Sequence, residues 1–174
     1  VDITDGATAT ITNDDNAAIT IGDVSGAENG GAITVTATLD NAVQGGFTVD
    51  VSTVDGTATI ADSDYTAIAG ETLTFAGTAG ETQTFTITPA ADTKLEADET
   101  VSVRMANLAG TALSVDITDG ATATITNDDN ATVTIGDVSG AENGGAITVT
   151  ATLDNAVQGG FTVDVSTVDD IATI

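Results

Sequence analysis

The chain has 174 residues and a formal net charge of −25, because 27 acidic residues face only two basic ones, Lys94 and Arg104. Such a charge repels nucleic acid and anionic membrane surfaces, so we expect no nucleic acid as a partner and no direct membrane insertion. The absence of cysteine and histidine excludes disulfides, thiolate chemistry and the commonest transition-metal ligands. Hydrophobic residues still make up 41% of the chain, which is enough for a folded core.

The expected secondary structure is β-strand throughout. In residues 32–39, AITVTATL, apolar side chains occupy every second position and threonine fills most of the others, which is typical of a half-buried strand. The same alternation predicts seven strands in chain order, at residues 17–21, 32–39, 47–54, 71–75, 83–88, 99–105 and 121–126. Segments rich in glycine and small residues separate them. Seven short antiparallel strands in about 110 residues predict an all-β fold of the sandwich type.

The amino-acid sequence at the start of the chain recurs near its end. Residues 1–60 and 115–174 differ at only four positions, with an offset of 114 residues. This period is longer than the roughly 20–50 residues of a solenoid repeat and has the size of a domain. We therefore expect a C-terminal strand of a preceding repeat at residues 1–14, a complete repeat at 15–128, and the N-terminal strands of a following repeat at 129–174. Tandem near-identical copies favour a structural role over catalysis, and we expect no enzyme.

Acidic residues from distant segments are expected to meet at one end of the sandwich. Because successive strands alternate in direction, the loops after the first, third and fifth strands share one end with the exit from the seventh. These segments carry Asp23, Glu28, Asp55, Asp62, Asp64, Asp92, Glu96, Asp98, Glu99, Asp128 and Asp129. Like charges a few ångströms apart repel by roughly 1–4 kcal/mol per pair. A hard divalent cation such as Ca²⁺, which takes about 6–8 oxygen ligands, would relieve that repulsion.

Five segments of the complete repeat resemble a Calx-β domain. They are DGTATIADSDY at residues 55–65, ETLTF at 71–75, ETQTFTI at 81–87, LEADETV at 95–101 and ATITNDD at 123–129. This family occurs in sodium–calcium exchangers and, in tandem arrays, in large bacterial (RTX-type) surface adhesins. The resemblance implies a seven-stranded antiparallel immunoglobulin-like β-sandwich that binds Ca²⁺ at the end facing the next domain.

The resemblance also implies the calcium ligands. Carried over by motif, they are Glu28, Asp64, Asp92, Glu96, Glu99, Asp128 and Asp129, to which the repeat adds the copies Asp14, Asp15 and Glu142. The chain departs from the exchanger pattern at Ala90, Ala91, Thr93 and Asn127, where that pattern has acids. Fewer charged ligands imply fewer or weaker ions, with dissociation constants of roughly 10⁻⁴–10⁻³ M. The sequence leaves open that these acids are solvated surface charges or turn formers instead.

These observations favour a structural extender repeat of a large secreted bacterial cell-surface adhesin, with calcium at the inter-repeat junctions stiffening the array. The expected partners are calcium ions and the neighbouring repeats of the same chain, and Ca²⁺ is the expected cofactor. Two alternatives stay open: a calcium-sensing regulatory Calx-β module, and a ligand-binding adhesive domain. The distal ligand of the parent protein has no signature in the sequence.

Overall fold

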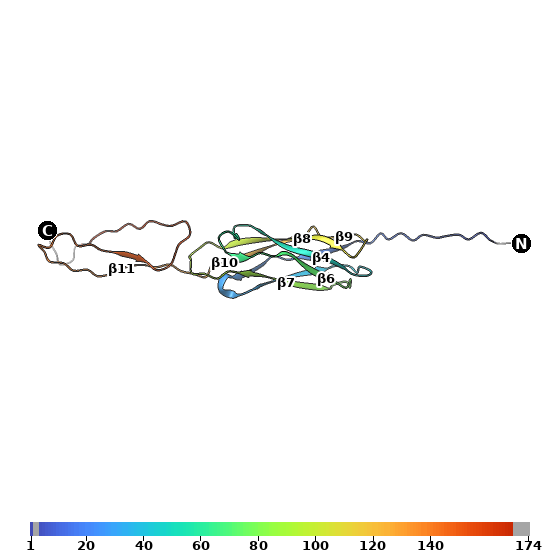
Figure 1. Cartoon of the computed structure of the whole chain (residues 1–174), viewed down its shortest axis with the longest axis horizontal. Coiled ribbons are helices and arrows are strands. Elements are labelled where there is room, and N and C mark those ends of the chain that lie inside the picture. The colour runs from blue at the N-terminus through green and yellow to red at the C-terminus, as the bar shows by residue number, and fades with distance from the viewer. Residues whose placement is uncertain (2–3, 169–174) are drawn as a thin grey trace.

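The computed structural model describes residue 1 and residues 4–168, and residues 17–126 form a sandwich of two five-stranded sheets (Figure 1). The first sheet has the strand order β5 (Tyr65–Thr66), β7 (Thr82–Pro89), β3 (Ile33–Leu39), β1 (Ala17–Ile21) and β9 (Val115–Asp116). The second has the order β2 (Val24–Ala27), β10 (Gly120–Thr126), β8 (Glu99–Ala109), β4 (Phe47–Asp55) and β6 (Ala69–Phe75). The all-β sandwich expected from the alternation is confirmed.

Three short strands, β2, β5 and β9, add to the seven that the alternation predicts. The chain passes from β1 to β2, and so from one sheet to the other, at Gly22 and Asp23. Asp23 Oδ1 accepts a hydrogen bond of 2.8 Å from the Thr122 N–H of β10, which fixes this crossing. Because the first and last strands run in the same direction, β1 pairs with β9 and β2 with β10 in parallel, where the sequence predicts antiparallel pairing alone.

The core lies between the two sheets and follows the period of two. In β3 the side chains of Val35, Ala37 and Leu39 are completely buried, and the threonines between them face outward or lie half-buried. The rings of Phe47 and Phe75 stack in this core, with centroids 5.1 Å apart. Burying such side chains stabilises the fold by roughly 1.5–3 kcal/mol each. All buried residues of this core lie within residues 17–126, so the core is complete without the flanking segments.

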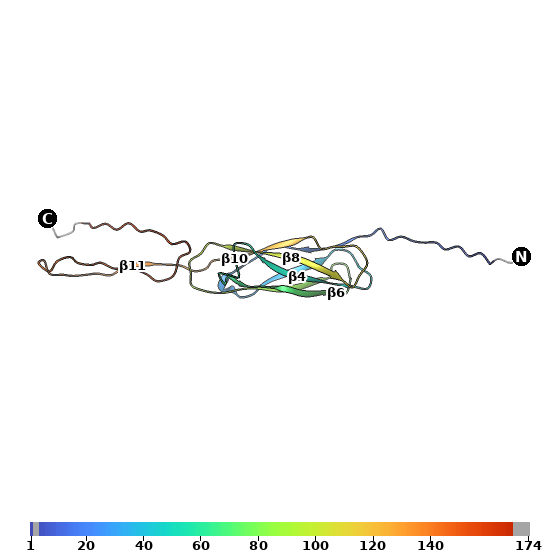
Figure 2. The same ribbon diagram turned by 45° about the horizontal axis from the view of Figure 1, so that its top comes forward.

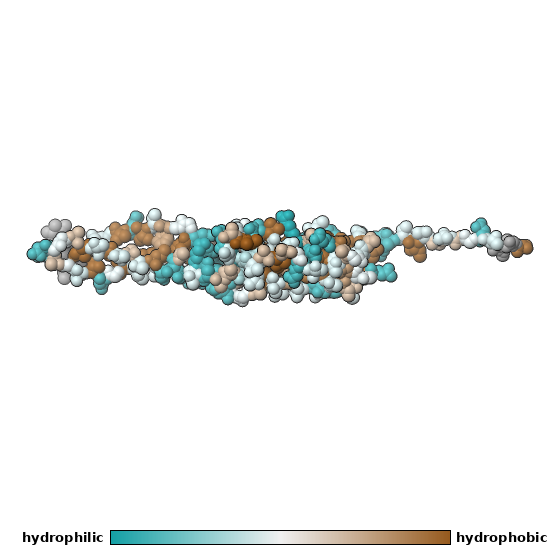
Figure 3. All heavy atoms as spheres, in the orientation of Figure 1, coloured by the Kyte–Doolittle hydropathy of each residue, from teal (hydrophilic) through white to brown (hydrophobic). Residues whose placement is uncertain are grey.

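The flanking segments leave the sandwich at opposite ends, as both ribbon views show (Figure 2). Residues 4–16 contain no strand, and the strands in the described residues after β10 are β11 (Val133–Ile135) and β12 (Ala151–Leu153), which pair with each other. Apolar residues in the segment after β10 lie at the surface (Figure 3). Phe161, which corresponds in sequence to the buried Phe47, is 51% exposed. A division into repeats stays a prediction. No helix in the described residues is long and apolar enough to cross a membrane.

Candidate metal centre

Seven carboxylates from separate segments lie at the end of the sandwich where the chain leaves β10. Six of them lie in loops or in a short 3₁₀ helix, and Glu99 is the first residue of a long strand. Glu28 opens the 3₁₀ helix η1 (Glu28–Gly30), Asp64 precedes β5, Asp92 and Glu96 lie between β7 and β8, Glu99 opens β8, and Asp128 and Asp129 follow β10. Two groups of three among them have carboxylate oxygens within 4.8 Å of one another.

The first group consists of Glu28, Asp128 and Asp129. The Glu28 side chain is buried, with 7% exposed, and its Oε1 accepts a 2.8 Å hydrogen bond from the backbone N–H of Asp92. Asn29 Nδ2 donates to Asp128 Oδ1 at 2.9 Å. Asp129 Oδ2 is buried and has no hydrogen-bond partner among the described residues. A buried carboxylate oxygen without a partner is costly, and a cation is the ligand that would satisfy it.

The second group consists of Asp64, Glu96 and Glu99. The side chains of Glu96 and Glu99 are 8% and 9% exposed. Asp64 Oδ2 is held by the Thr59 N–H at 2.7 Å, and the Lys94 ammonium forms an ion pair with Glu96 Oε1. This ion pair neutralises one of the three charges and leaves two carboxylates close together.

The two groups share a small cavity of about 10 Å³. Glu28 lines it from the first group and all of the second group lines it from the other side, together with Ala97, Ile125 and Asn127. A cavity of this size holds about one water molecule or one ion. Glu28 and the three carboxylates of the second group therefore face a common space.

The electrostatics of this end are unfavourable without a counter-ion. Burial raises the pKa of Glu28, and the charges of Asp92, Asp129 and Glu96 raise it further. Burial also raises the pKa of Glu99, with additional contributions from Asp64 and Glu96. The pKa of Asp129 is raised by burial and then by the neighbouring carboxylates, Asp128 first among them. All three pKa values respond to crowded negative charge in a partly dry environment.

The donor set fits a hard cation. Every candidate ligand atom is a carboxylate or amide oxygen, and six of the carboxylates form two clusters that Lys94 only partly compensates. Oxygen ligands without nitrogen or sulfur select Ca²⁺ or Mg²⁺, and the irregular loops suit the flexible coordination of Ca²⁺ better than the strict octahedron of Mg²⁺. The unpartnered Asp129 Oδ2 is the atom that most clearly lacks a ligand.

A comparison with protein-family models matches residues 12–137, well over half of the chain, to the Calx-beta domain. The chain belongs to the Calx-β domain family. A search of curated proteins finds no match.

Solved Calx structures have the same fold as this Calx-β domain. The apo form of the Calx CBD1 domain has a TM-score of 0.55 and 24% identity, covering 65% of this chain and 98% of that one. CBD12 from CALX1.2 has a TM-score of 0.55 and 24% identity, covering 64% of this chain and 44% of that one. The calcium binding domain CBD12 of CALX1.1 has a TM-score of 0.52 and 27% identity, again covering 64% and 44%. The chain thus spans less than half the length of the CBD12 structures.

The Calx-β fold brings seven of the ten sequence-predicted ligands to one end and leaves three elsewhere. Asp92 lies at this end, outside both groups of three, and it contacts Glu28 through its backbone N–H. Asp14 and Asp15 are exposed in the segment before β1, which leaves the sandwich at the opposite end (Figure 1), and Glu142 is exposed in the segment after β11. Within the described residues none of these three joins a cluster of acids. Their counterparts in sequence, Asp128, Asp129 and Glu28, form the first group.

Two amides at this end were not among the predicted ligands. Asn127 Oδ1 accepts from the Glu96 N–H at 3.1 Å, and its Nδ2 donates to the carbonyl oxygen of Asp129 at 3.0 Å. Gln158, from the following segment, donates from Nε2 to Glu99 Oε1 at 3.2 Å. The sequence signal for Asn127 is its place before Asp128 in the TITNDD segment. Gln158 has no local signal, because only the junction brings it near.

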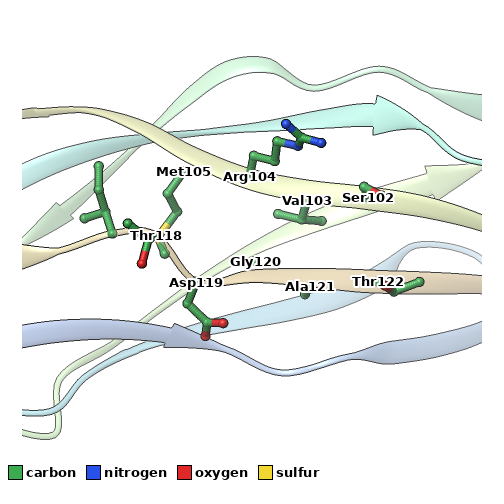
Figure 4. Close-up of a pocket in the computed structure, with 10 residues that line it drawn as sticks. Ser102, Val103, Arg104, Met105, Thr118, Asp119, Gly120, Ala121 and Thr122 are labelled. Atoms are coloured by element: carbon green, nitrogen blue, oxygen red, sulfur yellow. The ribbon is translucent and has the colours of Figure 1, made fainter.

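One surface hollow lies away from the carboxylates. It has a volume of about 580 Å³ and is lined by residues 102–105 of β8 and residues 117–122 around the start of β10. Arg104 and Asp119 point in different directions from it (Figure 4). Asp119 Oδ2 is instead engaged by the Ile21 N–H at 2.9 Å. The hollow presents no convergent charged pair and is not a candidate site.

Proposed function

We propose that the chain is a calcium-binding structural repeat from the extender region of a large secreted bacterial surface adhesin. Ca²⁺ would sit at the junction between one repeat and the next and stiffen the array. Membership of the Calx-β family and the near-identity of residues 1–60 and 115–174 support this proposal. The location outside the cell, at the bacterial surface, is part of the same proposal.

The observation that carries the calcium part is the unpartnered, buried Asp129 Oδ2 within a group of three carboxylates. Asp128 and Asp129 lie in the linker that leads from β10 to β11. Anything that binds both of these residues and Glu28 therefore fixes the linker to the body of the sandwich. The second group would hold a further ion through Asp64, Glu96 and Glu99, at the start of β8.

Bound calcium would supply positive charge to this end. The chain contributes the rest: the Asp92 N–H orients Glu28, the Thr59 N–H orients Asp64, and Asn127 ties the β7–β8 loop to the linker. Burial first and then the neighbouring carboxylates raise the pKa values of Glu28, Glu99 and Asp129, so their charged forms are unfavourable here without an ion. Stiffening would follow from compensating these charges and from holding the linker.

A calcium titration by calorimetry tests the proposal, with scattering profiles recorded in calcium and in chelator. We expect binding heat, a rise in melting temperature and a stiffer profile in calcium. Asp128→Asn with Asp129→Asn should remove much of the heat. Asp14→Asn with Asp15→Asn is the matched control, because it changes the same NDDN sequence where no cluster forms. Equal heats for the two double variants, or no heat at all, would contradict the proposal.

The calcium-sensing alternative has one observation in its favour, the likeness to the calcium binding domain CBD12 of CALX1.1 at 27% identity. A calcium sensor must bind calcium tightly and cooperatively at the concentrations used in signalling. A spacer needs only calcium sites that are filled at the calcium concentration around it. Near-identical neighbouring copies favour the spacer. Steep titration at micromolar calcium would favour the sensor.

A further inference from the structure

Residues 155–158, in the segment after β10, contact the loop between β7 and β8. Leu95, in the loop between β7 and β8, forms an isolated parallel bridge with Val157. The Leu95 N–H donates to the Ala156 carbonyl oxygen at 2.9 Å, and the Gln158 N–H donates to the Leu95 carbonyl oxygen at 2.9 Å. We call residues 155–158 the docking loop. Its contact with the preceding repeat is made by backbone hydrogen bonds on both sides of Leu95.

The same sequence occurs at residues 41–44 of the complete repeat and adopts the same conformation. Gly45 and Gly46 have φ of 87° and 70°, and their copies Gly159 and Gly160 have φ of 75° and 69°. The turn bond recurs, from the Gly46 N–H to Val43 at 3.3 Å and from the Gly160 N–H to Val157 at 3.2 Å. The loop is therefore already in its docking shape in a complete repeat, where positive φ favours glycine.

The complete repeat uses one side of this loop for its own fold and leaves the other side open. The Val43 N–H donates to the Gly77 carbonyl oxygen at 2.9 Å, and Val43 is buried. The two groups that dock in the copy, the carbonyl oxygen of Ala42 and the N–H of Gln44, have no partner among the described residues. Because neighbouring peptide groups point to opposite sides of an extended segment, these two face away from the sandwich.

A surface hollow lies beside this open side. Its volume is about 200 Å³, and it is lined by residues 42–44, by Leu113 and Ser114, and by Asn13, Asp15 and Asn16 of the incoming linker. The incoming linker is where a preceding repeat would end. The hollow therefore lies where the β7–β8 loop of that preceding repeat would arrive.

We infer that residues 41–44 are a docking surface for the β7–β8 loop of the preceding repeat, recognised through Ala42 C=O and Gln44 N–H on the two sides of its Leu95 equivalent. The occupant is a second copy of this repeat. The two hydrogen bonds at Leu95 are made by backbone groups, so they require no particular side chain in the docking loop. It also brings Gln158 to Glu99, which places one repeat's amide on its neighbour's candidate ligand.

Amide hydrogen exchange on the unmodified chain in chelator tests this inference. Gln44 and Gln158 have identical neighbours, DNAVQGGF, so their intrinsic exchange rates are equal. We expect the Gln158 N–H, which is docked, to exchange at least about tenfold more slowly than the undocked Gln44 N–H. Equal rates would overturn the inference. Failure of the chain to bind calcium would overturn the proposed function and leave this result unaffected.

A disulfide test gives a second readout in a chain that has no cysteine. Parallel bridge partners lie within disulfide reach, so Leu95→Cys with Val157→Cys should close rapidly into an intramolecular disulfide. The control is Leu95→Cys with Val43→Cys, which uses the identical loop at the far end of the sandwich. It should stay reduced within one chain. An open 95–157 pair, or equal closure of both pairs, would contradict the docking.

Discussion

Replacing Glu99 by glutamine distinguishes an electrostatically strained ligand from a structural side chain. Glu99 is 9% exposed, and its carboxylate lies within 4.8 Å of those of Asp64 and Glu96. Two unit charges at that separation repel by about 0.9 kcal/mol in bulk water and by about 3.5 kcal/mol at an effective dielectric constant near 20. Glu99→Gln neutralises both pairs and keeps Oε1 as the acceptor for Gln158.

The Lys94 ion pair and solvent screening offset part of this repulsion, so we expect a net stabilisation of about 1–3 kcal/mol in chelator. For a domain of this size, each 1 kcal/mol shifts the melting temperature by roughly 4 °C or more. In saturating calcium we expect Glu99→Gln to melt below the unchanged chain, because the variant has lost a charged ligand. Calcium affinity should fall about tenfold or more.

Thermal unfolding followed by circular dichroism, in chelator and in calcium, measures both effects. Glu71→Gln is the matched control, because it makes the same charge change at an exposed position of β6. The reasoning is refuted if Glu99→Gln melts no higher than Glu71→Gln in chelator and binds calcium as tightly as the unchanged chain.

Three further outcomes follow from the structure. In chelator, the melting temperature should fall as pH rises above the ordinary glutamate pKa of 4.5. The pKa values of Glu28 and Glu99 are raised in the folded chain, so the stability that their protonation supplies is lost as pH rises through those raised values, and a flat profile would contradict this. Phe75→Ala should cost about 3–5 kcal/mol in denaturant unfolding, because Phe75 is 1% exposed and stacks on Phe47. Gly77→Ala should destabilise by more than about 1 kcal/mol, because φ is +91° and a methyl group would collide with the Val43 carbonyl oxygen; Gly80→Ala (φ +76°), where nothing lies within 4 Å of an added Cβ, should cost less.

The strands could be predicted because alternation of apolar and polar residues directly reflects burial on a pleated sheet. Residues 17–21 and 121–126 match β1 and β10 to within a residue. The short strands could not be predicted, since β2 exists through its parallel pairing with β10 and β9 through its pairing with β1. Such pairing depends on which strands become neighbours, and local sequence does not encode it.

The candidate site, too, could be predicted only in part from the sequence. Alternating strand direction is enough to place Glu28 and Glu99 at one end, because it depends only on the order of elements. The finer roles depend on backbone geometry: Asp92 orients Glu28 through its N–H, and Asn127 bridges Glu96 and Asp129. Residue type alone suggests ligation for an aspartate and neutrality for an asparagine, so these supporting contacts are visible only in the fold.

The most direct test of the account is an anomalous difference map from crystals of this chain grown in millimolar calcium. The account predicts peaks between the carboxylates of Glu28, Asp128 and Asp129 and between those of Asp64, Glu96 and Glu99. A map with no anomalous peak at either group would contradict it.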